Sequence, residues 1–283
     1  MTVRQDIADG VATLTLDRPE TMNAFDSGMI QEFLAALDLV DADDDIRAVV
    51  VTGAGRGFCS GADLSRGAQS FVRPDAELAA GPPRDRAGII ALRILRLTKP
   101  IIGAVNGPAI GLGASLTLPM DVRLAADTAK FGFVFARRGI TPDGASSWFL
   151  PHLVGISTAA TWMLTGRVVG ADEALRAGLV AAIHPAEDLV VAAQQIAREI
   201  AENCSPVAVA ITRQLLWRTL GDHGPHEAHR LESEAIAWCA ANADAREGVS
   251  AFTERRPPTF PMTVSKDLPR FVADADWNST RCP

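Results

Sequence analysis

Two glycine-rich turns are the segments of this sequence that are best placed to do chemistry. The first is 58–64 (FCSGADL) and the second is 106–113 (NGPAIGLG), and each follows an apolar run that predicts a buried strand. Each turn leads from a strand towards a helix start, where backbone N–H groups lack partners within the helix and the helix dipole favours negative charge. Two such turns can direct two N–H donors at one oxygen atom, which is how preorganised donors stabilise an oxyanion.

Three other patterns are less able to carry chemistry. Segment 53–57 (GAGRG) follows an apolar run, but no helix opens directly after it, as a dinucleotide-binding loop requires. Ser115 lacks the second glycine of a nucleophile elbow, which argues against a serine hydrolase. His223, His226 and His229 have a spacing that does not bring their side chains to one point on a helix. We therefore expect no metal site.

The composition is typical of an ordinary globular protein. Apolar residues make up 48% and charged residues 22% of the 283 residues, which excludes disorder as the main state. Lys and Arg number 27 against 34 Asp and Glu, so the net charge of −7 provides no positive field for a nucleic-acid backbone. We expect no nucleic-acid partner.

The cysteines and the N-terminus indicate a cytoplasmic location. The four cysteines form no CxxC pair, and the first ten residues are polar and charged where a signal peptide would be apolar. Segment 100–120 has no charged side chain, but its asparagine, prolines and glycines prevent one unbroken membrane helix. We expect a reduced protein without a membrane span.

Strands alternate with amphipathic helices over the first part of the chain. The pattern predicts a half-buried strand at 11–16, strands covered on both faces at 46–52 and 101–105, and helices that begin at Asp26 or Ser27 and near residue 87. Strand and helix signals in this order favour α/β layering with right-handed crossovers.

After about residue 183 the sequence predicts only helices. They are expected at 187–202, 207–219, 228–240 and 245–252. Ser205 and Pro206 give the second of these helices an N-cap followed by proline at the first helical position. We expect 71–86 to be a mobile loop and the tail after Pro257 to be extended, because both are rich in proline and polar residues.

Ordered motifs from residue 16 to residue 252 resemble the enoyl-CoA hydratase/isomerase (crotonase) superfamily. They are 16–19 (LDRP), 22–25 (MNAF), the two glycine-rich turns, 164–167 (LTGR), 177–180 (AGLV) and 247–252 (EGVSAF). The resemblance implies an α/β fold, a spiral of ββα units with a C-terminal helical trimerisation region, assembled as a homotrimer or as a hexamer that is a dimer of trimers. It also implies an acyl-CoA thioester as ligand and no separate cofactor, since coenzyme A is part of the substrate.

The resemblance implies an oxyanion hole made by the backbone N–H groups of Ala62 and Leu112. These donors would polarise the carbonyl of a CoA thioester and favour its enolate. Leu112 stands where a glycine is usual in the family, but the change keeps the N–H group.

At two positions this sequence lacks the catalytic residues of the hydratases in the family, which affects the reaction that it is expected to catalyse. The two glutamates that hold and deprotonate a water are matched here by Ser115 and Phe135, and neither side chain is a base near neutral pH. Segment 131–155 instead resembles members with an acid at the position of Asp143, among them enoyl-CoA and dienoyl-CoA isomerases. One carboxylate beside an enolate can take a proton from one carbon and return it to another. Asp143 can also serve as a helix N-cap, so the sequence leaves both roles open.

The resemblance places the substrate against residues from both ends of the chain. It implies an adenine near Ala24, Ala62, Asp63 and Leu64, with Phe252 and Arg255 reaching over from the C-terminal region, and Ser115 and Phe135 on the acyl side. A guanidinium such as that of Arg255 suits a phosphate, although a solvated charge pair is an alternative role. Phe135 can also be a core residue, and Asp63 is expected to stabilise its turn and not to act as a catalyst.

The expected organisation is an acyl-CoA-binding spiral core at 1–195, a helical oligomerisation region at 196–260 and a C-terminal extension at 261–283. The expected function is an acyl-CoA enzyme of fatty-acid or related acyl-CoA metabolism that isomerises the double bond of an enoyl-CoA through a thioester enolate, with Asp143 as the proton carrier. Two alternatives remain, namely an enoyl-CoA hydratase that uses Asp143 and one water, and a catalytically weak acyl-CoA binding or carrier protein.

Overall fold

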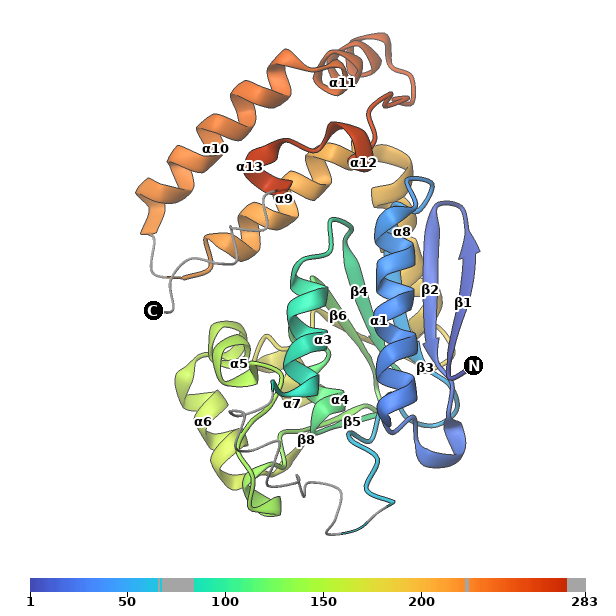
Figure 1. The fold of residues 1–283 in the computed structure, drawn as a ribbon, viewed down its shortest axis with the longest axis vertical. Helices are drawn as coiled ribbons and strands as arrows, with labels where there is room; N and C mark the ends of the chain where they lie inside the picture. Colours follow the sequence, from blue (N-terminus) through green and yellow to red (C-terminus); the bar gives the residue numbers. More distant parts are fainter. Residues whose placement is uncertain (66, 68–83, 222–223, 274–283) are drawn as a thin grey trace.

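The computed structural model describes residues 1–65, 67, 84–221 and 224–273 (Figure 1). Its main sheet has six strands in the order β1-β2-β3-β4-β6-β9. These strands are β1 (Val3–Ala8), β2 (Val11–Leu16), β3 (Ala48–Gly53), β4 (Ile101–Val105), β6 (Val122–Ala126) and β9 (Ala182–His184). β1 and β2 form an antiparallel hairpin, and each later neighbour pairs in parallel, which confirms the expected α/β layering.

A smaller three-stranded sheet carries the second glycine-rich turn. Its order is β5 (Pro108–Ile110), β7 (Lys130–Gly132) and β8 (Val168–Gly170). The short helix α4 (Leu112–Ser115) follows β5 directly. The other helical segments of this part are η1 (Pro19–Thr21), η3 (Ala136–Arg138), α5 (Ser146–Val154), α6 (Ile156–Thr165) and α7 (Ala171–Arg176).

Three long helices cover the main sheet. α1 (Ser27–Ala42) and α3 (Arg86–Leu95) lie side by side in Figure 1, and α8 (Leu189–Asn203) packs against β2, β3, β4 and β6. The carboxylate of Asp26 caps α1 by accepting from the Met29 amide at 2.8 Å, which confirms the expected start of this helix. Asp85 caps α3 in the same way through the amide of Gly88 at 3.0 Å. The expected mobile loop therefore ends before Asp85, and its residues 71–83 lie outside the described part of the chain.

β2 is more buried than its alternating sequence predicts. All six of its residues are buried, including Thr13 and Thr15, so the expectation of a half-buried strand is wrong. The reason is that α8 crosses the face that carries the threonines, where Gln194 Nε2 donates to Thr13 Oγ1 at 3.1 Å. A hydroxyl that finds such a partner is compatible with a covered face.

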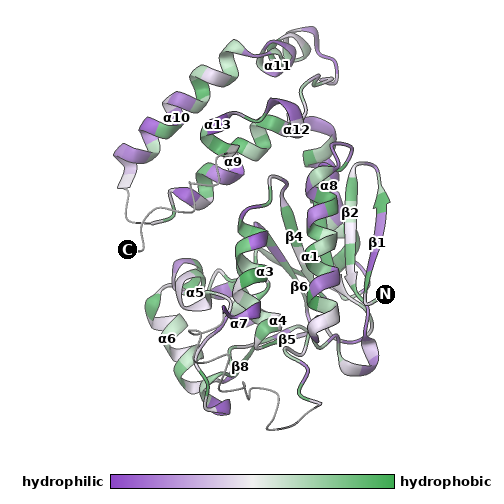
Figure 2. Cartoon of the chain, viewed as in Figure 1, coloured by the Kyte–Doolittle hydropathy of each residue, from purple (hydrophilic) through white to green (hydrophobic). Residues whose placement is uncertain are grey.

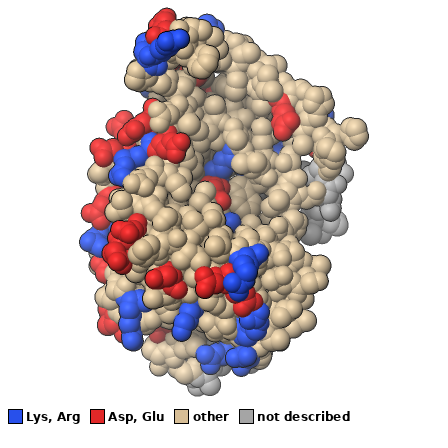
Figure 3. Space-filling view, turned by 180° about the vertical axis from the view of Figure 1, so that it is seen from behind, with Lys and Arg blue, Asp and Glu red and all other residues tan. Residues whose placement is uncertain are grey.

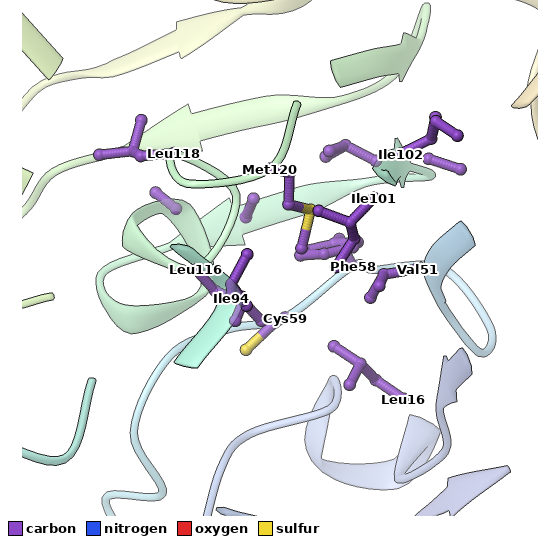
Figure 4. Close-up of a cluster of buried hydrophobic side chains, with 14 of the residues drawn as sticks. Leu16, Val51, Phe58, Cys59, Ile94, Ile101, Ile102, Leu116, Leu118 and Met120 are labelled. Atoms are coloured by element: carbon purple, nitrogen blue, oxygen red, sulfur yellow. The ribbon is translucent and has the colours of Figure 1, made fainter. Parts of the chain in front are cut away.

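The two glycine-rich turns grow out of a packed apolar core. Figure 4 shows Cys59, which follows β3, in one cluster with Ile94 of α3 and Leu116 at the end of α4. Because the interior of a folded domain is close-packed, the turns are held by contacts on several sides. The apolar colouring of strand β4 in Figure 2 follows the same core.

The C-terminal helices form a separate arm at one end of the sheet (Figure 1). They are α9 (Pro206–Arg218), α10 (Gly224–Ala241), α11 (Ala243–Glu254), α12 (Val264–Asp267) and α13 (Arg270–Ala273). Ser205 Oγ caps α9 by accepting from the Ala208 amide at 3.1 Å, with Pro206 at the first position, as the sequence predicts. The arm has its own small apolar cluster, which includes Val207, Ile211, Ala235 and Met262.

Two boundaries differ from the expected ones. Residue 195 lies inside α8, and Leu189, Ala193 and Ala197 of this helix belong to the core of the sheet, so the arm begins at α9. The tail after Pro257 is not simply extended, because it forms α12 and α13 and places Met262 in the cluster of the arm. Apolar side chains in the tail make this packing favourable, and its proline content alone was a poor guide.

Charges of both signs share the surface. Figure 3 shows Lys and Arg side chains interspersed with Asp and Glu over one face, where no large basic surface stands out. Within the described residues, no helix has both the length and the apolar character that a membrane span requires.

Candidate active site

The structure holds the two glycine-rich turns side by side. A parallel bridge joins them, because the Cys59 amide donates to Pro108 O at 3.0 Å and the Ile110 amide donates to Cys59 O at 2.9 Å. Gly61 then approaches the second turn so closely that a Cβ on it would lie 2.7 Å from Ile110 O and 3.7 Å from the nitrogen of Leu112. Its φ of +104° also favours glycine. Backbone geometry and close approach therefore both require glycine here.

Ala62 presents an unused N–H group beside this contact. Its neighbours pair with Phe25, since the Phe25 amide donates to Gly61 O at 2.8 Å and the Asp63 amide donates to Phe25 O at 2.9 Å. In such a bridge the N–H of the central residue points to the opposite side. Among the residues that the structure describes, the Ala62 amide has no hydrogen-bond acceptor. It is therefore available to a ligand.

Leu112 offers a second unused amide. It is the first residue of α4, and no acceptor for its N–H is found in the described part of the chain. The unusual backbone conformation falls on Gly111, which has φ +55° and ψ −122°, while Leu112 itself is helical. The Gly111 amide donates to Gly132 O at 2.8 Å and so ties the turn to β7. A leucine at position 112 thus costs nothing in backbone strain.

Asp143 lies against the end of α4. Gly144 packs so tightly on Ser115 that a Cβ on Gly144 would lie 2.9 Å from the Cβ of Ser115. The Gly144 amide donates to Asp85 Oδ2 at 3.4 Å, which links this segment to the start of α3. Ser115 is one helical turn beyond Leu112, so the loop of Asp143 faces the same short helix that carries the unused amide.

Burial makes Asp143 a much weaker acid than usual. It raises the pKa of Asp143 to about 6, and the negative charge of Asp85 acts in the same direction, while the hydroxyl of Ser115 acts against it. Burial also raises the pKa of the Cys59 thiol to about 12, with a contribution from the charge of Asp143. Cys59 is thus neutral, and Asp143 is the group of this pair that changes its charge near neutral pH.

The side chain of Asp143 does not cap α5. The N-cap residue of this helix is Ala145, in a left-handed conformation with φ +53° and without a side-chain cap. Asp143 contributes only its main-chain oxygen, which accepts from the amide of Ser146 at 2.9 Å and from its hydroxyl at 2.6 Å. The capping role that the sequence left open is therefore wrong, and the carboxylate is available for another purpose.

Arg18 links Ala24 to the first turn, which contains Asp63 and Leu64. Arg18 Nη1 donates to Ala24 O at 2.7 Å, and its Nη2 lies 3.2 Å from a carboxylate oxygen of Asp63. The Ser65 amide, followed by Arg18, lowers the pKa of Asp63, which matches the expected turn-stabilising role. Leu64 is exposed.

Of the three remaining predicted residues, Phe135 shares the apolar core with both turns, whereas Phe252 and Arg255 lie apart from them. Phe135 is buried in the core at the start of η3. Phe252 is 85% exposed on α11, and Arg255 ends that helix with φ +57°. Figure 1 places α11 at the far end of the arm, well away from α4 and β5. Within one chain, therefore, neither residue reaches the turns.

Two residues that support the first turn, Asn23 and Arg18, were not assigned a role from the sequence. Asn23 has φ +57°, and its Nδ2 donates to Ala54 O at 2.9 Å and to Gly57 O at 2.8 Å. Its Oδ1 accepts from the Arg18 amide at 2.8 Å. The signal for Asn23 was its place in the MNAF motif.

The three histidines of the C-terminal region were expected not to form a metal site. Of these, His223 lies outside the described residues, so this expectation stays a prediction.

The sequence as a whole is similar to known acyl-CoA enzymes. Residues 6–262 match the family model described as enoyl-CoA hydratase/isomerase. An enoyl-CoA hydratase of Alternaria alternata is 40% identical over 258 residues, covering 91% of this chain and 85% of the relative. A 1,2-epoxyphenylacetyl-CoA isomerase of Escherichia coli is 35% identical over 254 residues, covering 90% of this chain and 96% of the relative.

Solved structures are similar in fold as well as in sequence. The crystal structure of an enoyl-CoA hydratase from Bacillus anthracis superposes with a TM-score of 0.83 at 29% identity, covering 92% of this chain and 99% of that chain. The expected fold class is confirmed, whereas trimer formation through the arm stays a prediction. On the strength of its sequence match and its architecture together, the chain belongs to the enoyl-CoA hydratase/isomerase (crotonase) family.

Proposed function

We propose that this protein is an acyl-CoA enzyme that moves a carbon–carbon double bond along the acyl chain by a 1,3-proton shift. The observation that carries the proposal is the Asp143 carboxylate, which is not used as a helix cap and has a pKa raised by burial to about 6. The positions of the two hydratase glutamates hold Ser115 and Phe135, so Asp143 is the proton carrier of the proposal.

The two unused amides supply the electrostatic part of the mechanism. Ala62 N–H and Leu112 N–H donate to the thioester oxygen and become stronger partners as that oxygen gains negative charge. Each donor of this type contributes roughly 3–4 kcal/mol in comparable sites. They lower the cost of removing a proton from C2, because the resulting negative charge resides mainly on the thioester oxygen.

Asp143 supplies the proton-transfer part. As a carboxylate it takes the proton from C2 of a 3-enoyl-CoA, the double bond moves to C2–C3, and the carboxylic acid returns the proton to C4. No water is consumed, and the carboxylate is regenerated. A pKa near 6 suits both steps, since the group is ionised at neutral pH and still binds a proton readily.

The remaining predicted contacts are assigned to binding. We assign Ala24, together with Asp63 and Leu64 of the first turn, to the adenine, and Ser115 and Phe135 to the acyl chain. Phe252 and Arg255 are remote from the turns of their own chain, so we assign them to the nucleotide of a neighbouring subunit in a homotrimer or hexamer. The substrate brings its own coenzyme A, the proposal needs no other cofactor, and its place is the cytoplasm.

The test is the substitution Asp143→Asn, which keeps the size of the side chain and removes the base. We expect isomerisation of a 3-enoyl-CoA to fall by about 10²–10⁴-fold, while the affinity for acyl-CoA stays within a few fold. Near-full activity of the variant would exclude Asp143 as the proton carrier. A wild-type protein that binds acyl-CoA tightly without turnover would favour the acyl-CoA binding or carrier protein.

A hydratase is the second candidate, because the relative from Alternaria alternata and the structure from Bacillus anthracis carry that name. It would use Asp143 and one water. Without the paired glutamates we expect crotonyl-CoA hydration to lose at least the ~10²–10⁴-fold that general acid–base catalysis provides. A turnover of crotonyl-CoA above about 10² per second, as good enzymes reach, would favour the hydratase.

A further inference from the structure

Two neighbouring polar atoms in the site, one on Ser115 and one on Asp143, have no hydrogen-bond partner among the described residues. Among the buried side-chain oxygen and nitrogen atoms of the described residues, Ser115 Oγ and Asp143 Oδ1 are two of the three that accept or donate no hydrogen bond. Buried polar groups in proteins are nearly always paired, so an exception points to a group that acts at another stage of function.

The packing brings these two residues together. Ser115 is fully buried at the end of α4, and Gly144 lies directly on it, with a Cβ position 2.9 Å from Ser115 Cβ and 3.7 Å from Ser115 Oγ. Asp143 is the residue before Gly144, so its carboxylate cannot move far from the serine. A larger residue than glycine at position 144 would push the two segments apart.

The two groups are chemically complementary. A serine hydroxyl donates one hydrogen bond, and an ionised carboxylate only accepts. We propose that Ser115 is a positioning residue, whose hydroxyl donates a hydrogen bond to the Asp143 carboxylate and favours its ionised form. Hydrogen bonds between catalytic groups are often long in a ligand-free site and tighten when substrate is bound. The inference rests on the proposed function, in which Asp143 moves the proton.

The other groups that face Asp143 determine in which direction each substitution should shift its pKa. Asp85, at the start of α3, is negative and works against ionisation of Asp143, so it opposes Ser115. Cys59, from the first turn, is held neutral and adds no charge. Removing the hydroxyl and removing the charge of Asp85 should therefore move the pKa of Asp143 in opposite directions.

The experiment compares Ser115→Ala with Asp85→Asn and with Thr117→Val as a matched control. Asp85→Asn keeps an oxygen that can cap α3 through the Gly88 amide. Thr117→Val removes a buried hydroxyl two residues after Ser115, but one that already donates to Ala114 O at 2.8 Å. Infrared difference spectra of each complete protein, recorded from about pH 4 to about pH 9, report the carboxylic acid band of Asp143, which is identified by its loss in Asp143→Asn.

We expect the midpoint of this band near pH 6 in the wild type, higher in Ser115→Ala, lower in Asp85→Asn and unchanged in Thr117→Val. In the isomerase assay, the ratio of kcat at about pH 8 to kcat at about pH 6 should rise from about 2 to about 5 in Ser115→Ala, because less of the base is ionised at the lower pH. An unchanged midpoint in Ser115→Ala overturns the inference, and so does a loss of kcat that is equal at both pH values. The infrared titration needs no turnover, so a protein without isomerase activity would refute the proposed function and still decide the role of Ser115.

Discussion

Arg213 of α9 and Asp121 of the loop before β6 form an ion pair at 2.8 Å that ties the helical arm to the sheet. The guanidinium is almost completely buried, and it also donates to Ile94 O at 2.9 Å and Leu95 O at 3.0 Å, at the end of α3. Carbonyl groups at the end of a helix have no partner within the helix, and a cation is favoured there. Arg213 thus joins the arm, the sheet and the helix whose other end faces Asp143.

We expect Arg213→Met to destabilise the protein by about 3 kcal/mol. Methionine fills the space but removes the positive charge that pairs with Asp121, to which only the Ile101 amide and the Trp217 indole then donate in the described part of the chain, and it removes the hydrogen bonds of Arg213 to the carbonyls of α3. Chemical denaturation at fixed protein concentration measures the loss. The matched control is Arg230→Met, since Arg230 lies on the surface of α10 beside Glu227 and such exposed pairs contribute less than about 1 kcal/mol. Equal losses in the two variants would contradict a structural role for Arg213.

Asp143 should make the folded protein less stable as the pH rises. Its folded pKa of about 6 lies above the ordinary value of 3.8, so the folded state binds more protons than the unfolded state between these values. The free energy of unfolding therefore falls through this window, and the loss is complete above about pH 6. Asp143→Asn removes this penalty, and we expect it to stabilise the protein by about 2–3 kcal/mol near pH 7 and by little near pH 4.

Chemical denaturation at these two pH values checks this prediction. The control is Asp188→Asn, which replaces an exposed aspartate. A variant at Asp143 that is no more stable than the wild type near pH 7 would show that the carboxylate is adequately solvated in the folded state. A gain in stability with a loss of turnover is the usual trade-off at a catalytic position.

Arg255 and its neighbour Arg256 should differ in their effect on ligand binding. Arg256 already pairs with Glu247 and Glu254 at 2.6 and 2.7 Å within its own chain. If Arg255 binds the phosphates of coenzyme A, Arg255→Ala should weaken acyl-CoA binding about tenfold or more and leave a pantetheine thioester almost unaffected. Calorimetric titration of both ligands measures this, with Arg256→Ala as control. An equal loss for the two ligands would assign Arg255 to folding or assembly.

The arm carries exposed apolar side chains that we expect another subunit to cover. Leu216, Ile236 and Val249 are each 66–69% exposed on α9, α10 and α11. Such surface is typical of an interface, and light scattering should show a trimer or hexamer. Ile236→Asp should shift the protein to smaller species, whereas Leu39→Asp, on the similarly exposed surface of α1, should not. A stable monomer of the wild type at micromolar concentration would contradict the prediction.

Much of the local structure could be predicted from the sequence. The cap of α1 at Asp26, the strand β4 and the start of α9 at Ser205 depend on a few adjacent residues, because capping and strand burial leave short-range signals. The glycine-rich turns and their place after buried strands were likewise readable, since a turn with positive φ favours glycine. Family motifs then implied which of their amides face a substrate.

Tertiary structure decided what the neighbours of each residue are. The sequence allowed Asp143 to be a helix cap, and only the fold placed Ala145 at that position and buried the carboxylate against Ser115 and Asp85. The sequence predicted β2 as half-buried, because α8, the helix that covers its second face, lies far away in the chain. The pKa of a carboxylate and the burial of a strand depend on contacts between distant segments, and a residue pattern within one segment does not contain them.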